Sequence, residues 1–280
     1  MLNLALTTVI DVGNFSTKYA YKTKKGIECN SFDSILHTYK PLEESLEDAR
    51  RVQYGILDYW VGKGVEDFYL GRKEQMYYGN TRKGHHEAQI RLVRALYEIH
   101  KETKEKEFNL ILTCPYDSMV SDKQYFTEKF EGERTAIIDG EEFNFKVNRI
   151  IMAAEGLGAL HFSESPTCAI VDAGSMTLNV LYLINGTISK QDSHTINGGT
   201  IQNSTFELAS NFAKVCTNIS YDYPLVCTGG KAGEMKEALS ELNYSNIIVA
   251  ELPNGKPSYY VNAVGLLLKY SEKFEVMFAS

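Results

Sequence analysis

Two stretches of the chain combine an aspartate, a glycine and small polar residues in the same order. In each, a β-branched run leads into the aspartate, the glycine follows two positions later, and a second alternating apolar run comes after the polar residues. This pattern predicts a β-hairpin whose turn carries the polar groups. The residues that could do chemistry are Asp11, Gly13, Asn14, Ser16, Thr17 and Lys18 in the first copy, and Asp172, Gly174, Ser175, Met176 and Thr177 in the second.

These residue types favour a phosphate site. A glycine tolerates positive φ and lets a backbone N–H approach an anion, and successive N–H groups in such a turn form a concave anion site. The hydroxyls add donors, and Lys18 adds positive charge. Two aspartates would repel an anion unless a hard cation lay between them and the phosphates, so Asp11 and Asp172 are predicted to hold Mg²⁺ through water. One copy alone would be typical of an ordinary hairpin, whereas two copies favour a nucleotide site.

The paired hairpins resemble the two phosphate loops of the actin, Hsp70 and sugar-kinase superfamily. Residues 153–159, which include Glu155, look like the helix that links the two domains of that superfamily, and residues 262–265 look like its second connecting helix. Residues 227–232 are similar to the adenosine loop, so the resemblance implies that Gly229, Gly230 and Lys231 contact the nucleotide.

The resemblance implies an α/β, actin-like two-domain ATPase fold made of duplicated ribonuclease-H-like domains with mixed five-stranded sheets. ATP or GTP would bind with Mg²⁺ in the interdomain cleft. Domain I is expected to comprise residues 1–152 and 262–280, with a small upper subdomain at about 37–80, and domain II residues 153–261. Too few residues lie between the second hairpin and the adenosine loop for an upper subdomain in domain II. In this the chain resembles the short members of the ParM/AlfA group of actin-like plasmid-segregation ATPases.

Hydrophobic periodicity predicts two helices of interest. Residues 85–104 form an amphipathic pattern that leaves Arg91 and Arg94 on the solvent-facing side. Residues 152–162 are predicted to form the helix that carries Glu155.

Glycine-containing turns mark other boundaries. Gly198, Gly199 and Thr200 are predicted to form the glycine turn that leads into a helix over residues 205–215, and to touch the nucleotide, because backbone donors at a helix N-terminus favour anions. Two dipeptides predict hairpin turns, Asp139-Gly140 and Asn185-Gly186.

Aromatic residues are crowded between positions 37 and 80: Tyr39, Tyr54, Tyr59, Trp60, Tyr69, Tyr77 and Tyr78. Two interpretations stay open. These side chains could pack a small insertion onto its parent domain, or some could face outward, since Tyr and Trp are favoured anchors of protein interfaces.

Composition limits the partners. The net charge of −7 argues against a broad nucleic-acid-binding surface, so any link to DNA is expected to be indirect. The five cysteines include no C-x-x-C pair, and no apolar run reaches the roughly 18 residues that a membrane span needs. These features predict a cytoplasmic protein without a disulfide framework and without a membrane partner.

The resemblance implies a nucleotide-dependent filament protein that segregates plasmid DNA. It would assemble with itself into a helical filament, single or bundled, and reach a centromere-like DNA site through a small DNA-binding adaptor. Glu155 would polarise the water that attacks the γ-phosphate, and Asp172 would assist through the metal shell. Two alternatives are a small-molecule kinase of the same superfamily, which would need a carboxylate base beside an acceptor hydroxyl, and an Hsp70-like regulatory ATPase that does not polymerise.

Overall fold

The computed structural model describes residues 5–41, 46, 48–64, 82–253 and 255–278, with side chains described up to residue 271. The chain divides into two compact units. The first comprises Met1–Thr113 and Val120–Met152, and the second comprises Cys114–Met119 and Ala153–Ser280. Residues 262–280, which the sequence analysis gave to domain I, therefore group with the second unit.

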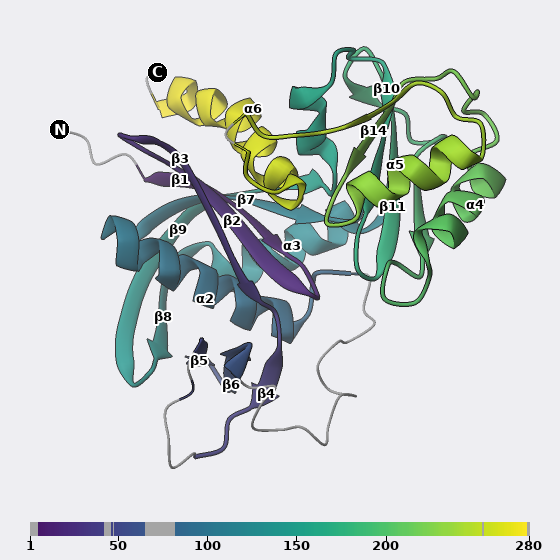
Figure 1. Cartoon of the computed structure of the whole chain (residues 1–280). Helices are drawn as coiled ribbons and strands as arrows, with labels where there is room; N and C mark the ends of the chain where they lie inside the picture. The colour runs from purple at the N-terminus through teal and green to yellow at the C-terminus, as the bar shows by residue number, and fades with distance from the viewer. Residues whose placement is uncertain (1–4, 42–45, 47, 65–81, 254, 279–280) are drawn as a thin grey trace. The chain divides into compact units, whose positions relative to one another are not determined.

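The first unit is built on a nine-stranded mixed sheet (Figure 1). Five neighbouring strands at one side of it form a mixed sheet in which β1 (Leu6–Val12) and β7 (Glu107–Cys114) run parallel, as the resemblance implied. The sheet is longer than the five strands expected, because Val52 of β5 pairs with Ile138 of β8 and so joins the strands of the small subdomain to it. In spatial order the strands are β3 (Gly26–Asp33), β2 (Ser16–Thr23), β1 (Leu6–Val12), β7 (Glu107–Cys114), β9 (Glu141–Ala154), β8 (Gly132–Ile138), β5 (Ala49–Tyr54), β6 (Leu57–Gly62) and β4 (Leu36–Thr38).

Helix α2 (His86–Thr103) packs against β1 and β2 and also against β5 and β6. Ile90, Val93 and Leu96 are fully buried, as the amphipathic pattern predicted. The expectation that Arg91 and Arg94 face solvent is wrong, since they are only 1% and 6% exposed. Both guanidinium groups instead donate hydrogen bonds to backbone carbonyls, Arg91 to that of Ser34 and Arg94 to that of Val61 in β6. Helix α3 (Met119–Phe130) follows the short 3₁₀ helix η2 (Tyr116–Ser118).

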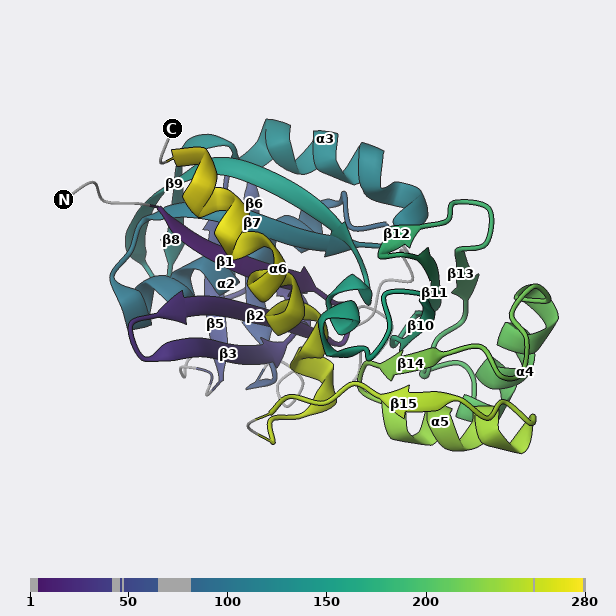
Figure 2. The ribbon, with the colours of Figure 1, turned by 90° about the horizontal axis from the view of Figure 1, so that it is seen from above.

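The second unit holds a six-stranded sheet with helices α4 (Thr205–Val215) and α5 (Ala232–Glu241), and Figure 2 shows α5 lying along β14 and β15. Val180, Phe212 and Met235 are fully buried in the core between the sheet and these helices. Helix α4 begins with a capping box in which Ser204 and Glu207 exchange hydrogen bonds. The strand order is β12 (Thr187–Ile188), β11 (Thr177–Ile184), β10 (Cys168–Ala173), β14 (Leu225–Thr228) and β15 (Ile247–Val249), with β13 (His194–Asn197) also paired to β11.

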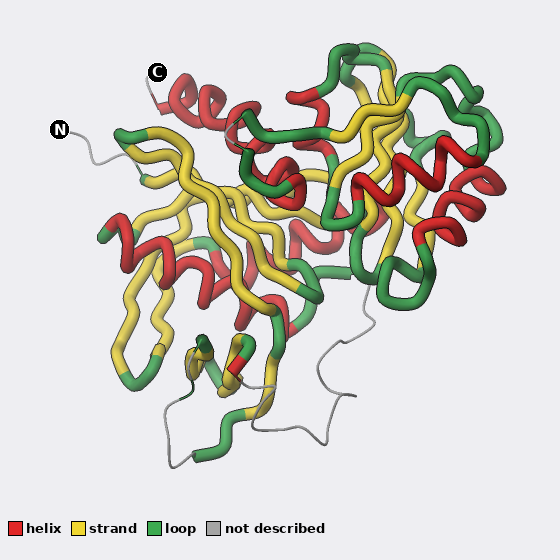
Figure 3. The backbone as a smooth tube through the Cα atoms, viewed as in Figure 1, coloured by secondary structure: helices red, strands yellow, loops and turns green. Residues whose placement is uncertain are grey.

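The duplicated hairpins predicted from the sequence are both present, and each lies beside a parallel strand. The β1–β2 hairpin pairs with β7, and the β10–β11 hairpin pairs with β14. Residues between Asp172 and Gly229 are all described and form β11 to β14 and α4, with no inserted subdomain. The two dipeptide turns also form at positive φ, and Figure 3 shows the long β8–β9 hairpin that one of them closes.

The predicted helix over residues 152–162 is wrong in its first half. Strand β9 runs to Ala154, because its alternating apolar side chains, among them Phe143, Phe145 and Val147, keep the segment in the sheet. Gly156 then turns the chain at φ 85°, and only the 3₁₀ helix η3 (Leu157–Phe162) follows. Glu155 therefore lies in the turn between a strand and a short helix.

Helix α6 (Val261–Phe278), which follows the 3₁₀ helix η4 (Ser258–Tyr260), crosses η3 at very short range. A Cβ atom on Gly158 would lie 2.1 Å from the Asn262 carbonyl oxygen, and one on Gly265 would lie 2.0 Å from the Gly158 carbonyl oxygen. Glycine at these two positions therefore allows the close packing of α6 on η3. Among the described residues, no helix has both the length and the apolar character needed to cross a bilayer.

Candidate functional site

The first candidate loop is a tight turn between β1 and β2. The Gly13 amide donates to the Asp11 carbonyl oxygen at 2.9 Å, and a Cβ on Gly13 would lie only 2.4 Å from the Ser16 carbonyl oxygen. Close contact therefore requires glycine here, whereas the positive φ that the sequence suggested is not found at Gly13 or at Gly174.

The Asp11 carboxylate lies in a cationic environment within the first unit. Its Oδ1 accepts a hydrogen bond from Thr113 Oγ1 at 2.7 Å, and its Oδ2 lies 3.4 Å from Lys18 Nζ. Burial opposes ionisation, but Lys18, Lys83 and the Thr113 hydrogen bond together hold the pKa of Asp11 below its ordinary value. Asp11 is therefore an anion at neutral pH, which suits contact with a cation.

Lys83 contacts this loop from a distant part of the sequence, and the sequence did not predict it. Its Nζ is buried and donates to the Val12 carbonyl oxygen at 2.9 Å, while its backbone amide donates to Asp122 Oδ2. A lysine followed by a glycine directly before the helix at 85–104 was the available signal. Without a hairpin motif of its own, that signal did not stand out.

Two predicted nucleotide ligands turn their side chains into the first unit. Asn14 Oδ1 accepts a hydrogen bond from Arg91 Nη1 at 3.2 Å, and Thr17 Oγ1 lies 2.8 Å from Ser34 Oγ. Both residues are buried, and Ser16 pairs across β2 and β3 with Asp33. The side chains of Asn14 and Thr17 therefore stabilise the loop through hydrogen bonds within the first unit.

The second candidate loop is held by the glycine turn at 198–201. The carbonyl oxygens of Gly174, Ser175 and Met176 accept hydrogen bonds from the amides of Thr200, Ile201 and Gly198, at 3.0 to 3.1 Å. A Cβ on Gly199 would lie 2.3 Å from the Gly174 carbonyl oxygen, so only glycine fits. The amides of Ser175 and Met176, by contrast, donate no hydrogen bond to any described residue.

Asp172 is enclosed by two glycines with positive φ. A Cβ on Gly156 would lie 3.1 Å from the Asp172 Cβ atom, and one on Gly229 would lie 2.7 Å from Asp172 Oδ1. Thr228 pairs in register with Asp172 across β10 and β14, and its buried hydroxyl has no hydrogen-bond partner among the described residues. A carboxylate beside an unsatisfied hydroxyl is a donor set that fits a hydrated cation.

Glu155 is placed near Asp172 and is held by a residue that sequence reasoning missed. Asn179 Nδ2 donates to Glu155 Oε2 at 2.7 Å, and Asn179 Oδ1 accepts from Thr195 Oγ1 at 3.0 Å. Both Glu155 and Asn179 are buried. Asn179 pairs with Asp172 as Lys18 pairs with Asp11 in the first hairpin, so the hairpin alignment was the signal for it.

The adenosine-loop candidates differ from one another. The Gly229 carbonyl oxygen accepts from Ser258 Oγ at 3.1 Å, whereas a Cβ on Gly230 would meet open space. Lys231 is exposed and forms an ion pair with Glu234. Neither Gly230 nor Lys231 lies against the Asp172 carboxylate in the way Gly229 does.

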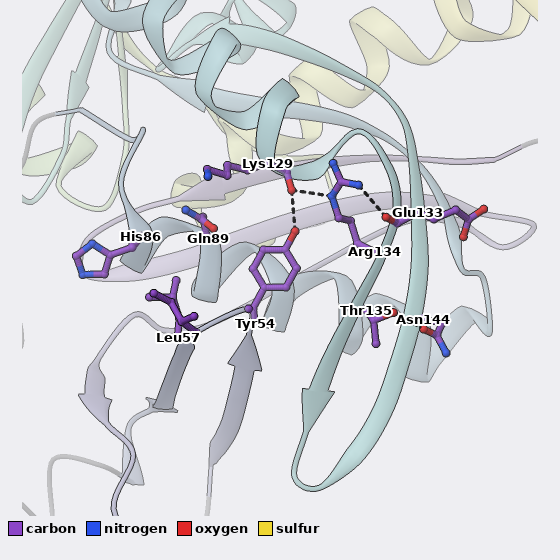
Figure 4. Close-up of a pocket in the computed structure, with 11 residues that line it drawn as sticks. Tyr54, Leu57, His86, Gln89, Lys129, Glu133, Arg134, Thr135 and Asn144 are labelled. Atoms are coloured by element: carbon purple, nitrogen blue, oxygen red, sulfur yellow. Dashed lines mark hydrogen bonds between the residues drawn. The ribbon is translucent and has the colours of Figure 1, made fainter.

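Elsewhere in the first unit, the small subdomain borders a pocket of about 640 Å³ (Figure 4). Tyr54, whose hydroxyl donates to the Lys129 carbonyl oxygen, and Arg134 lie in its wall. None of the residues predicted to bind nucleotide lines it. Across the described part of the chain, no group of three or more His, Cys, Asp or Glu residues forms a metal cluster.

The chain matches known actin-like proteins. The family profile described as the N-terminal domain of actin-like proteins matches residues 9–158. An AlfA filament from B. subtilis plasmid pLS32 is 68% identical, covering 95% of this chain and 99% of that one with a TM-score of 0.92. An AlfA filament bound to AMPPNP is 69% identical, covering 98% and 99% with a TM-score of 0.93.

More distant structures share the fold. Apo pSK41 ParM is 17% identical, covering 98% of this chain and 100% of that one with a TM-score of 0.66. No curated protein sequence matched this chain.

Proposed function

Because the chain belongs to the actin-like proteins, we propose that it is a nucleotide-dependent filament subunit that segregates plasmid DNA and hydrolyses ATP. One observation carries the proposal. The chain is 68–69% identical, over nearly its whole length, to the subunits of AlfA filaments, one of which is bound to AMPPNP.

The two hairpin loops serve the phosphates of one nucleotide, ATP or GTP. In the first loop, Gly13 keeps the backbone close and Lys18 supplies positive charge. In the second, the Ser175 and Met176 amides are the donors, because neither amide donates a hydrogen bond to any described residue. Gly198, Gly199 and Thr200 thus support the phosphate loop, and Gly229, Gly230 and Lys231 border the nucleoside.

Asp11 and Asp172 would hold Mg²⁺ through water, and this ion would neutralise charge on the phosphates. Glu155 orients the attacking water as the carboxylate that Asn179 holds in place. The hydrogen bond from the Asn179 amide to Glu155 Oε2 fixes the orientation of that carboxylate. Asp172 assists through the water shell of the metal.

The partners follow from the same proposal. The subunit assembles with further copies of itself into a helical filament in the cytoplasm. Its net charge of −7 supports an indirect link to centromere-like DNA through a small DNA-binding adaptor.

The test is 90° light scattering of the pure protein with Mg-ATP, followed by negative-stain microscopy of the same sample. Filaments that appear only with nucleotide support the proposal. Bound ATP without assembly, over a range of protein and salt concentrations, would favour the small-molecule kinase and call for a substrate screen.

Substitution Glu155→Gln tests the catalytic assignment. Glutamine keeps an oxygen that can accept from Asn179, so ATP binding and assembly should be retained, while phosphate release slows by about two orders of magnitude or more. A matched control is Glu164→Gln, since Glu164 is exposed. Phosphate release at the wild-type rate from Glu155→Gln filaments would refute the role of Glu155.

A further inference from the structure

Arg91 carries a buried charge directly beneath the first phosphate loop. Its side chain is 1% exposed. Burial lowers the pKa of Arg91 to about 10, so the group is still charged at neutral pH. Its ion pair with Glu87 is long, with Glu87 Oε2 at 3.9 Å from Arg91 Nη2. A buried arginine with so distant a counter-ion costs free energy unless other polar groups satisfy it.

Those polar groups belong to the loop and to the segment that supports it. Arg91 Nε donates to the Ser34 carbonyl oxygen at 2.9 Å, and Nη1 donates to Asn14 Oδ1 at 3.2 Å. Ser34 in turn holds the far side of the loop, since its amide donates to the Phe15 carbonyl oxygen at 3.0 Å and its Oγ lies 2.8 Å from Thr17 Oγ1. The Arg91 guanidinium group is therefore connected to Asn14 directly, and to Phe15 and Thr17 through Ser34.

We propose that Arg91 is a positioning residue that fixes the first loop in its phosphate-binding conformation before nucleotide arrives; the inference rests on the proposed nucleotide-binding function. Arg91 does not touch the phosphate. It acts through Asn14 and Ser34, and so reduces the ordering that the loop would otherwise undergo when nucleotide binds.

The geometry requires arginine at this position. The planar guanidinium presents several N–H donors in a fixed fork, so one side chain reaches the Asn14 amide oxygen and the Ser34 carbonyl at once. A lysine ammonium on a flexible stem could keep the charge but could not hold both acceptors in that geometry.

Arg94 provides a matched control on the same helix. It too is buried, at 6% exposure, but its Nη1 donates to the Val61 carbonyl oxygen at 2.6 Å and its Nη2 to the Asp48 carbonyl oxygen at 3.4 Å. No bond that it makes reaches the first loop. Loss of either arginine removes a buried charge, but only Arg91 should affect phosphate binding.

The experiment compares Arg91→Gln with Arg94→Gln, at protein concentrations too low for assembly. Fluorescent ATP titrations should give a Kd about tenfold higher for Arg91→Gln, because the loop must then be ordered by the nucleotide itself, and less than about twofold higher for Arg94→Gln. Without nucleotide, hydrogen exchange should rise at residues 11–18 and 34 in the first variant, and at residues 48 and 61–62 in the second.

Substitution Arg91→Lys keeps the positive charge, so it provides a second test if the Arg91→Gln variant does not fold. Its Kd for ATP should lie between those of wild type and Arg91→Gln. Wild-type affinity in Arg91→Lys, or equal loss of affinity in the Arg91→Gln and Arg94→Gln variants, would overturn the inference. Failure of the wild-type protein itself to bind ATP would instead refute the proposed function, so the two failures can be told apart.

Discussion

The Asp172 carboxylate shows how backbone geometry at one position can set the place of a functional group. Gly229 has φ 93°, and a Cβ there would lie 2.7 Å from Asp172 Oδ1. Substitution Gly229→Ala should therefore strain the backbone and displace the carboxylate, lowering the free energy of unfolding by about 1–3 kcal/mol. It should also weaken the magnesium dependence of ATP turnover. Urea unfolding and a magnesium titration of phosphate release measure the two effects.

The adjacent Gly230 is the control for this prediction. A Cβ on Gly230 would meet open space, and its φ is not positive. Gly230→Ala should thus change stability by less than about 0.5 kcal/mol. Equal effects of the two substitutions would show that contact with Asp172 is not what requires glycine at position 229.

Single residues also show which parts of the candidate site could be predicted from the sequence and which could not. The motif made Asp11, Asp172 and the loop glycines visible because hairpin spacing repeats. Asn179 and Lys83 stayed hidden, since an amide within an apolar strand and a lysine before a helix are common. Arg91 was assigned to solvent because a charge normally avoids the interior, yet here loop carbonyls satisfy it.

At the scale of elements, the start of α2 brings several basic groups together and makes stability depend on pH. His85 is the N-cap residue, and its Nδ1 accepts a hydrogen bond from the Ala88 amide. Burial, followed by the nearby charges of Arg91, Lys83 and His86, lowers the pKa of His85 from 6.5 to about 3. Between these values the unfolded chain binds more protons than the folded one, so the free energy of unfolding falls as pH falls below about 6.5.

Substitution His85→Asn should remove this slope, because asparagine caps a helix without titrating. Chemical unfolding of both proteins from pH 7.5 to 5 should show the wild-type protein losing up to about 1.4 kcal/mol more per pH unit below pH 6.5. At pH 7.5 the two should be close in stability. Parallel pH profiles would mean that His85 titrates normally in the folded protein.

Elements were predicted best where local and tertiary preferences agree. Helix α2 and the duplicated hairpins follow directly from periodicity and turn residues. The helix expected over 152–162 failed because its Ala-rich sequence favours helix locally, while strand pairing of β9 continues to Ala154. The length of the first sheet was also missed, since pairing of β5 with β8 depends on contacts between segments distant in sequence.

At the scale of the whole molecule, a filament needs two different surfaces on each copy, because only a heterologous contact that does not close gives an open helix. The second unit lacks the inserted subdomain, so the subunit contacts that such a subdomain would make have to be formed by other surfaces. Of the predicted aromatic cluster, Tyr69, Tyr77 and Tyr78 lie outside the described residues. Tyr39 and Trp60 pack on each other, with ring centroids 5.6 Å apart, which favours the packing interpretation for them.

Ile56 is a better candidate for a contact between subunits, since its side chain is fully exposed at the tip of the β5–β6 hairpin. Tyr54 holds that hairpin by stacking on Phe130 at 5.2 Å, so docking would order little additional chain. We expect Ile56→Ser to raise the protein concentration needed for Mg-ATP-dependent light scattering at least about fivefold, the loss of about 1 kcal/mol expected for an interface anchor. Its affinity for ATP should not change. Val120→Ser, at an 84% exposed position on α3, is the control. An unchanged critical concentration in Ile56→Ser would exclude this hairpin from the subunit contact.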